Sequence, residues 1–151
     1  MSRVEQLIAD CRAALAGDEP QEHVREIVAR AVCRPAELLG ALGEPQRAGL
    51  HELYRSAELT IVNVVWGPMM AIPPHNHGMW AIIGVYTGRE DNIFWRRIPA
   101  AVGRVEAAGA RVLCAGESQS LGRSVIHSVT NPIGRLTGAI HVYGGDFFNP
   151  E

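Results

Sequence analysis

The chain of 151 residues has no lysine, only three cysteines and few aromatic residues. All 14 of its basic residues are arginine, and 16 acidic residues outnumber them. This balance lacks the basic footprint of a nucleic-acid-binding protein, so we expect no nucleic-acid partner. Cys11, Cys33 and Cys114 are too few and too widely spaced for a disulfide framework. Their pattern favours reduced thiols and a cytoplasmic location.

Long apolar runs are also missing. No stretch approaches the roughly 18 consecutive apolar residues of a membrane span, and the N-terminus lacks the apolar core of a secretory signal. We therefore expect no membrane partner. Hydrophobic residues nevertheless make up 47% of the chain and charged residues 20%, which excludes wholesale disorder. A chain of this length can bury one sizeable core, so we expect a single domain over residues 1–151.

The first third of the chain, residues 1–45, has the periodicity of helices. Apolar residues recur three and four positions apart in residues 4–15 and 24–32. A third, short helix is expected over residues 35–42, closed by Gly43. About 45 residues make a poor independent core, so this helical segment is expected to pack on the rest of the domain.

The pattern changes near Tyr54. From about residue 54 to the end, short runs rich in β-branched and aromatic residues alternate with glycine, proline and asparagine. Such punctuation every ten residues or so is typical of an antiparallel all-β sandwich or barrel.

The pair His75-x-His77 is the most distinctive chemical feature of the sequence. Side chains alternate along an extended strand, so these two imidazoles are expected on the same side. Pro73-Pro74 directly before them favours an extended backbone and excludes a helix interior. Two imidazoles so placed can form half of a metal site, although an isolated pair fits an exposed polar loop equally well.

A third histidine, His127, shares one face of an expected strand with Val125 and Val129. Taken alone, it could be a core histidine or a ligand. Buried imidazole nitrogens need partners, and three neutral imidazoles facing into a small barrel satisfy one another best around a divalent metal. We therefore predict a metal site made of His75, His77 and His127.

The next strand adds two polar residues on one face. A turn at residues 131–134 precedes it, and Ala139, His141 and Tyr143 alternate onto the same side. If that side meets the face of His127, then His141 and Tyr143 lie beside the metal. The alternative is that both residues only pack the core.

Two segments resemble the conserved motifs of the cupins. Residues 67–90 resemble the first motif and residues 109–131 the second, and the occurrence of both in this order is a specific signal. The matching residues are His75, His77, Gly84 and Gly88 in the first motif, and His127 and Asn131 in the second. The resemblance implies an all-β cupin barrel, an antiparallel double-stranded β-helix, over about residues 54–151, with the N-terminal helical segment packed on it.

Within the cupins, the chain resembles the three-histidine thiol dioxygenases, of which cysteine dioxygenase is the best known. The glutamate that usually follows the first histidine pair is missing from residues 78–82. The resemblance implies a non-haem Fe(II) centre, or another divalent metal such as Zn or Ni in its place. The implied reaction oxidises a small thiol, cysteine or a related mercapto acid, with O2 to the sulfinic acid. It implies catalytic roles for His141 and Tyr143.

The chain departs from that family at two places. Ala139 replaces a serine, and Ile82 stands where some members have a cysteine that crosslinks to the tyrosine. Arg55 is the best match to the arginine that binds the substrate carboxylate, with Arg89 and Arg97 as alternatives. Glu90 lies in a dense run of charges, and we expect it to pair with an arginine at the rim or at an oligomer contact.

Two other functions remain open on the sequence alone. One is a metal-binding cupin with another reaction, such as a different oxygenase or an isomerase. The other is a non-enzymatic cupin that binds a small ligand. The missing glutamate ligand favours the thiol dioxygenase over a metal-binding cupin with another reaction, and a homodimer is compatible with all three.

Overall fold

The computed structural model describes residues 1–150 and has three helices followed by nine strands. The helices are α1 (Arg3–Ala14), α2 (Pro20–Val32) and α3 (Pro35–Leu42). The strands are β1 (Gly49–Arg55), β2 (Thr60–Trp66), β3 (Ala71–His75), β4 (Ala81–Thr87), β5 (Arg89–Arg97), β6 (Val105–Cys114), β7 (Ser118–Leu121), β8 (Ile126–Thr130) and β9 (Thr137–Tyr143).

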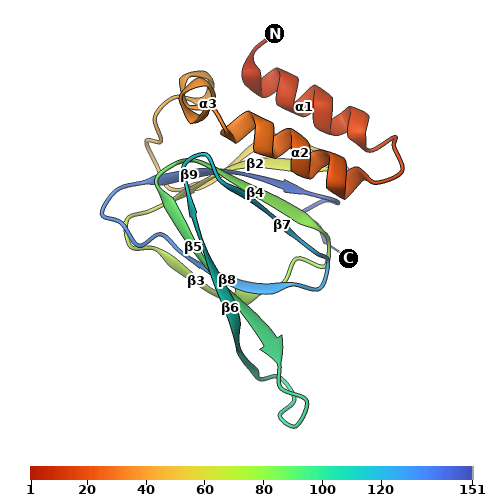
Figure 1. Cartoon of the computed structure of the whole chain (residues 1–151), viewed down its shortest axis with the longest axis vertical. Coiled ribbons are helices and arrows are strands. Elements are labelled where there is room, and N and C mark those ends of the chain that lie inside the picture. The colour runs from red at the N-terminus through yellow and green to blue at the C-terminus, as the bar shows by residue number, and fades with distance from the viewer. Residues whose placement is uncertain (151) are drawn as a thin grey trace.

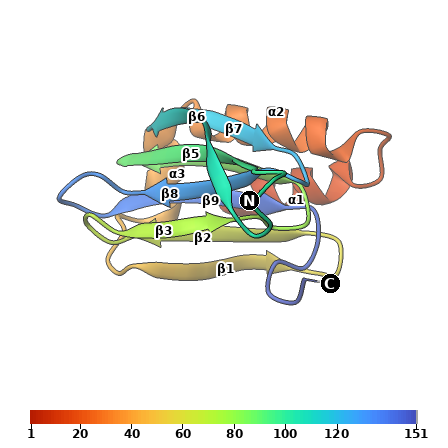
Figure 2. The same ribbon diagram turned by 90° about the horizontal axis from the view of Figure 1, so that it is seen from below.

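The strands form two antiparallel sheets that lie against each other (Figures 1 and 2). The larger sheet has the order β1-β2-β9-β4-β7, and the smaller sheet has the order β3-β8-β5-β6. Every strand pairing within them is antiparallel. The chain passes repeatedly from one sheet to the other, as in a double-stranded β-helix. The expectation of an antiparallel barrel is confirmed.

The helices cover the outer face of the larger sheet (Figure 1). Ile140 and Val142 of β9 belong to the same core cluster as Val24 and Val28 of α2. The opposite face of the same strand carries Ala139 and Tyr143, which belong to the core between the sheets. All seven residues of β9 are buried, which explains its nearly continuous apolar sequence. In residues 1–150 no helix combines the length and the apolarity needed to cross a membrane.

The barrel begins earlier than its sequence suggests. Strand β1 starts at Gly49, five residues before the expected change at residue 54. This strand is the edge of the larger sheet and is mostly exposed, so polar residues such as His51 and Glu52 alternate with apolar ones. An edge strand of this kind lacks the β-branched run by which the inner strands are recognised.

The packing of helix α2 against strand β4 gives the first prediction. A Cβ atom at Gly84 of β4 would lie 2.7 Å from Cγ1 of Val28 and 2.8 Å from Cγ1 of Val32. Both valines are stiff and fully buried. Gly84→Ala should therefore lower the free energy of unfolding by about 1–3 kcal/mol, measured by urea denaturation. Gly40→Ala in α3, where nothing lies within 4 Å, is the control and should not destabilise. Equal stability of the two variants would show that the helix does not dock at Gly84.

Candidate metal centre

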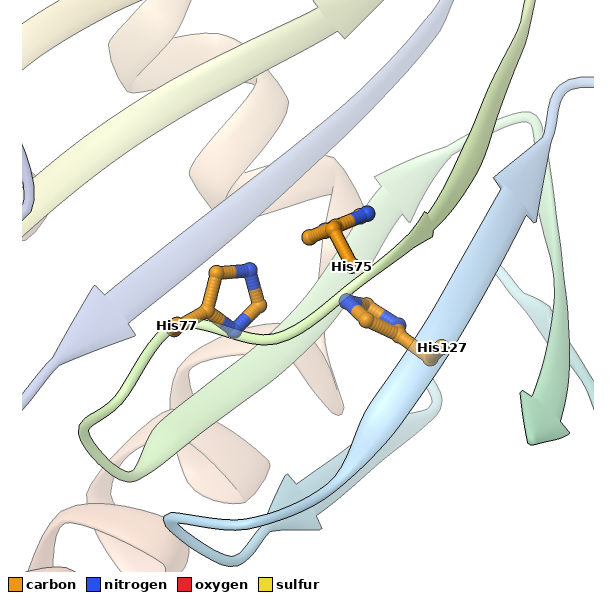
Figure 3. A group of neighbouring side chains, drawn as sticks. All are labelled: His75, His77 and His127. Atoms are coloured by element: carbon orange, nitrogen blue, oxygen red, sulfur yellow. The ribbon is translucent and has the colours of Figure 1, made fainter. Parts of the chain in front are cut away.

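Two of the three predicted ligands face each other from paired strands. His75 ends β3 and His127 lies in β8, and the two residues are register partners between these strands. Their ring centroids are 4.6 Å apart. Figure 3 shows the two imidazoles side by side on the inner side of the smaller sheet.

The third histidine lies two residues beyond the end of β3. His77 is in the segment that leads to Gly78, where a positive φ of 68° turns the chain toward β4. Its ring still points back to the other two, with centroid distances of 4.9 Å to His75 and 5.1 Å to His127 (Figure 3). One nitrogen from each ring lies within 4.8 Å of the others. The sequence predicted that His75 and His77 lie on one side of a continuous strand. Their rings do lie on one side, but His77 is beyond the end of β3, in the segment before Gly78.

Hydrogen bonds fix the orientation of two of these rings. Nδ1 of His75 lies 2.9 Å from the carbonyl oxygen of Pro73, and Nδ1 of His127 lies 2.9 Å from Oδ1 of Asn92. Both partners are acceptors, so each Nδ1 carries its hydrogen and each Nε2 keeps a free lone pair. Nε2 of His127 is buried and has no hydrogen-bond partner among residues 1–150. A metal ion is a ligand that would satisfy it.

The environment keeps the imidazoles of His77 and His127 neutral, as metal binding requires. Burial, reinforced by His75 and His141, lowers the pKa of His77 to about 3. Burial and the neighbouring histidines likewise lower the pKa of His127 to about 2. Geometry, the unpartnered nitrogen and the neutral rings all fit a divalent ion held by His75, His77 and His127. Imidazole donors suit Zn, Cu, Fe and Ni.

The cluster opens into a cavity of about 330 Å³ between the two sheets. Besides the three histidines, its wall includes Trp66, His141 and Tyr143, and the remainder is apolar. His77 and Tyr143 are in edge-to-face contact, with ring centroids 5.0 Å apart. The cavity thus has a polar end, formed by imidazoles and one phenol, and an apolar remainder.

His141 and Tyr143 reach this cavity from the larger sheet. The turn at residues 131–134 does not fold β9 back as a hairpin on β8; β9 lies between β2 and β4 in the other sheet. The face of β9 that carries His141 and Tyr143 therefore meets the face of β8 that carries His127 from across the barrel. Nδ1 of His141 lies 2.9 Å from the Tyr143 hydroxyl. Burial, together with the charge of Glu90, raises the pKa of Tyr143, so the phenol keeps its proton.

The expectation for Glu90 was wrong. Its side chain is fully buried and pairs with no arginine, because β5 turns Glu90, Asn92 and Phe94 inward and Arg89 and Asp91 outward. Arg89 pairs with Asp91 instead. Oε2 of Glu90 accepts a hydrogen bond from Nε1 of Trp66 at 2.9 Å and lies 3.2 Å from Nε2 of His141. Its Oε1 accepts from Nδ2 of Asn92 at 3.2 Å.

The Glu90 carboxylate therefore connects the side of the site that holds His127 with the side that holds Tyr143. Because the amide nitrogen of Asn92 donates to Glu90, the amide oxygen of Asn92 faces His127 and accepts from its Nδ1. On the other side, Glu90 holds His141, which holds Tyr143. The sequence analysis missed Asn92 and misjudged Glu90. Glu90, Asn92 and Phe94 follow one another at every second position, which is the pattern of one strand face. The charged residues around them made this pattern hard to recognise.

Arg55 does not lie where a substrate-binding arginine would be needed. Its guanidinium forms two hydrogen bonds to the Asp146 carboxylate and lies over the Phe148 ring. The side chain is 42% exposed, and it does not line the cavity. The C-terminal segment lies close to the end of β1 (Figure 2), and its Asp146 binds the Arg55 side chain outside the cavity. The expected carboxylate-binding role of Arg55 is therefore dropped.

Comparison with known proteins identifies the architecture. No protein-family model matches the chain. An RmlC-like cupin family protein with a double-stranded β-helix fold from Methanocaldococcus jannaschii shares 10% identity over 70% of this chain and 87% of its own, with a TM-score of 0.56. A protein from Bacillus halodurans shares 15% identity over 66% of this chain and 72% of its own, with a TM-score of 0.53.

An oxalate oxidase in complex with the substrate analogue glycolate is also similar. It shares 19% identity and a TM-score of 0.53, over 72% of this chain but only 55% of the oxidase chain. Likeness at such identities establishes the fold and leaves the reaction to be argued from the site. The fold class predicted from the sequence is confirmed: a cupin barrel with an N-terminal helical segment packed on it.

The hydrogen bond from His127 to Asn92 gives the second prediction. Asn92→Ala removes the acceptor that orients the His127 ring, so affinity for a divalent metal should fall about 10–100-fold. Competition titration of the metal-free protein with Co(II) and a chelator measures this change. Asn63→Ala, which removes a hydrogen bond from the Tyr86 hydroxyl, is the control and should leave the affinity unchanged. Equal affinities of the two variants would exclude an orienting role for Asn92.

The buried carboxylate gives the third prediction. Glutamine at position 90 has one amide nitrogen that must face either the Asn92 amide or the Trp66 indole, both of which are donors. Glu90→Gln should therefore lower the free energy of unfolding by about 1–3 kcal/mol, measured by urea denaturation. The matched control is Asp91→Asn in the exposed pair with Arg89, which should change stability by less than about 0.5 kcal/mol. Equal stability of the two variants would show that the hydrogen bonds accepted by the Glu90 carboxylate do not stabilise the fold.

Proposed function

We propose that the protein is a metal-dependent oxidoreductase that uses Fe(II) and O2 to oxidise a small thiol to its sulfinic acid. The observation that carries this proposal is the donor set. The cluster of residues that could hold a metal consists of His75, His77 and His127, with no carboxylate among them. The cupin fold and the likeness to an oxidase support an oxidoreductase of this architecture without naming its substrate.

The charge of the donor set favours a thiolate ligand. Three neutral imidazoles leave a divalent ion with its full charge, so binding of an anion is favoured, and a thiolate is a soft anion that forms once the thiol meets a metal. An Fe(II) ion held by His75, His77 and His127 would supply open coordination positions for the thiolate and O2. The overall reaction is balanced by R–SH and O2 alone: both oxygen atoms go to sulfur, and the product is R–SO2H.

Tyr143 and His141 are proposed to handle the proton of the thiol. The Glu90 carboxylate accepts from Nε2 of His141, which leaves Nδ1 free to accept from the Tyr143 hydroxyl. A thiol proton released in the cavity can therefore reach Nδ1 by way of the Tyr143 oxygen, which takes up one proton as it gives up its own. The hydroxyl can then donate a hydrogen bond to the bound substrate. In this scheme His141 is the proton acceptor, and Glu90 is a positioning residue that holds His141.

The apolar part of the cavity has its own role. Leu50, Met70 and Ile72 lie on the walls around the polar end. Walls of this kind keep water away from a reactive sulfur and strengthen the hydrogen bonds made at the polar end.

The decisive experiment measures O2 consumption by the Fe(II)-loaded protein with small thiols, and identifies the product by mass spectrometry. We expect one sulfinate for each O2 consumed. His75→Ala should lose metal and turnover together. O2 consumption without sulfinate, or sulfinate formation that survives loss of the metal, would contradict the proposal.

Tyr143→Phe gives the fourth prediction. The tyrosine is not among the proposed ligands, so the variant should bind metal as the wild type does. Loss of a positioned proton-transfer group should nevertheless reduce thiol oxidation about 10²–10⁴-fold. Metal content and O2 uptake are measured on the same sample. The matched control is Tyr86→Phe, which removes a buried hydroxyl that hydrogen-bonds Asn63 outside the cavity, and it should keep full activity. Wild-type turnover in Tyr143→Phe would show that the tyrosine only packs the barrel.

A further inference from the structure

We propose that the substrate is a thiol with an uncharged, apolar tail, and not an amino acid or a mercapto acid. This inference rests on the proposed thiol oxidation and names the chemical class of its substrate. It follows from how polar and apolar groups are distributed around the cavity.

The first observation is the lining of the cavity. Within residues 1–150, the polar side chains on its wall are histidines, Trp66 and Tyr143, and no Asp, Glu or Arg side chain lies on the wall. The histidines and Tyr143 stand at the end where the sulfur would bind. The rest of the wall, against which a tail would pack, is apolar and includes Leu50, Met70 and Ile72.

The second observation is the entrance. Leu50 is 52% exposed and Met70 is 41% exposed, although both line the cavity. Large apolar side chains that are open to solvent at the mouth of a cavity favour an apolar ligand, because binding covers them. A ligand with a charged tail would leave this surface in contact with water or with an ion.

The third observation is the position of the charged residues nearby. Arg55, the residue expected to receive a carboxylate, is bound to Asp146 outside the cavity. Glu90, which could have received an ammonium group, lies behind the wall with both oxygens already hydrogen-bonded. A carboxylate or an ammonium group in the tail would therefore be buried without a partner, which is strongly unfavourable.

The size of the cavity limits the tail. About 330 Å³ is roughly twice the volume of an apolar cavity that holds one benzene molecule, so a tail of several carbon atoms fits beside the metal-binding sulfur. Each methylene group buried against the apolar wall should improve the affinity roughly fourfold until the cavity is full.

Thiol binding to the Co(II)-loaded protein without oxygen tests this inference independently of turnover. The thiolate-to-cobalt absorption band is titrated with 1-propanethiol, 3-mercaptopropionate and cysteamine. We expect 1-propanethiol to bind at least tenfold more tightly than either charged thiol. Equal or tighter binding of 3-mercaptopropionate or cysteamine would overturn the assignment of an uncharged tail. A cobalt spectrum that no thiol changes would overturn the proposed function itself, and the substrate class with it.

A charged residue introduced at the entrance supplies the matched test. Met70→Arg places a guanidinium on the cavity wall, where its exposed position tolerates the change. The affinity ratio of 3-mercaptopropionate to 1-propanethiol should rise at least tenfold. The control is Met69→Arg, the adjacent residue, which is 66% exposed and does not line the cavity; its ratio should stay as in the wild type. An equal rise in both variants, or no rise in Met70→Arg, would contradict a tail site at this wall.

Discussion

The carboxylate of Glu90 is the group on which the arrangement of the candidate site depends. It is fully buried and takes part in hydrogen bonds with three side chains, from Trp66, Asn92 and His141. A buried carboxylate is stable only when such partners are in place, so the four residues constrain one another. Through Asn92 this constraint reaches the metal-binding end, and through His141 it reaches Tyr143.

The two sheets contribute different parts of the site. The smaller sheet holds His75 and His127 as register partners, so their spacing is set by the pairing of two strands. The larger sheet brings Tyr143 against His77 from across the barrel. Because helix α2 covers the other face of the larger sheet at Gly84, strands β4 and β9 of that sheet are buried on both sides. Rigid strands of this kind hold functional groups more closely in place than loops do.

The sequence predicted those features that depend on local pattern. Period-two alternation placed His127 inside, and the spacing of His75 and His77 put both rings on one side. The three helices were recognised from their apolar periodicity. The features that depend on pairing between distant strands were not predictable in this way. After the turn at residues 131–134 the chain crosses to the other sheet, and Glu90 finds its partners on β2, β5 and β9. Arg55 was misassigned because nothing local reveals its partner 91 residues away.

The central claim is that three imidazoles, and no carboxylate, hold an iron ion that binds a thiolate. X-ray absorption at the iron edge of the Fe(II)-loaded protein, before and after addition of 1-propanethiol, measures this directly. We expect three imidazole nitrogens at about 2.1 Å in both samples, and one additional sulfur at about 2.3 Å after the thiol is added. A first shell without the imidazole signature, or one that gains no sulfur from the thiol, would contradict it.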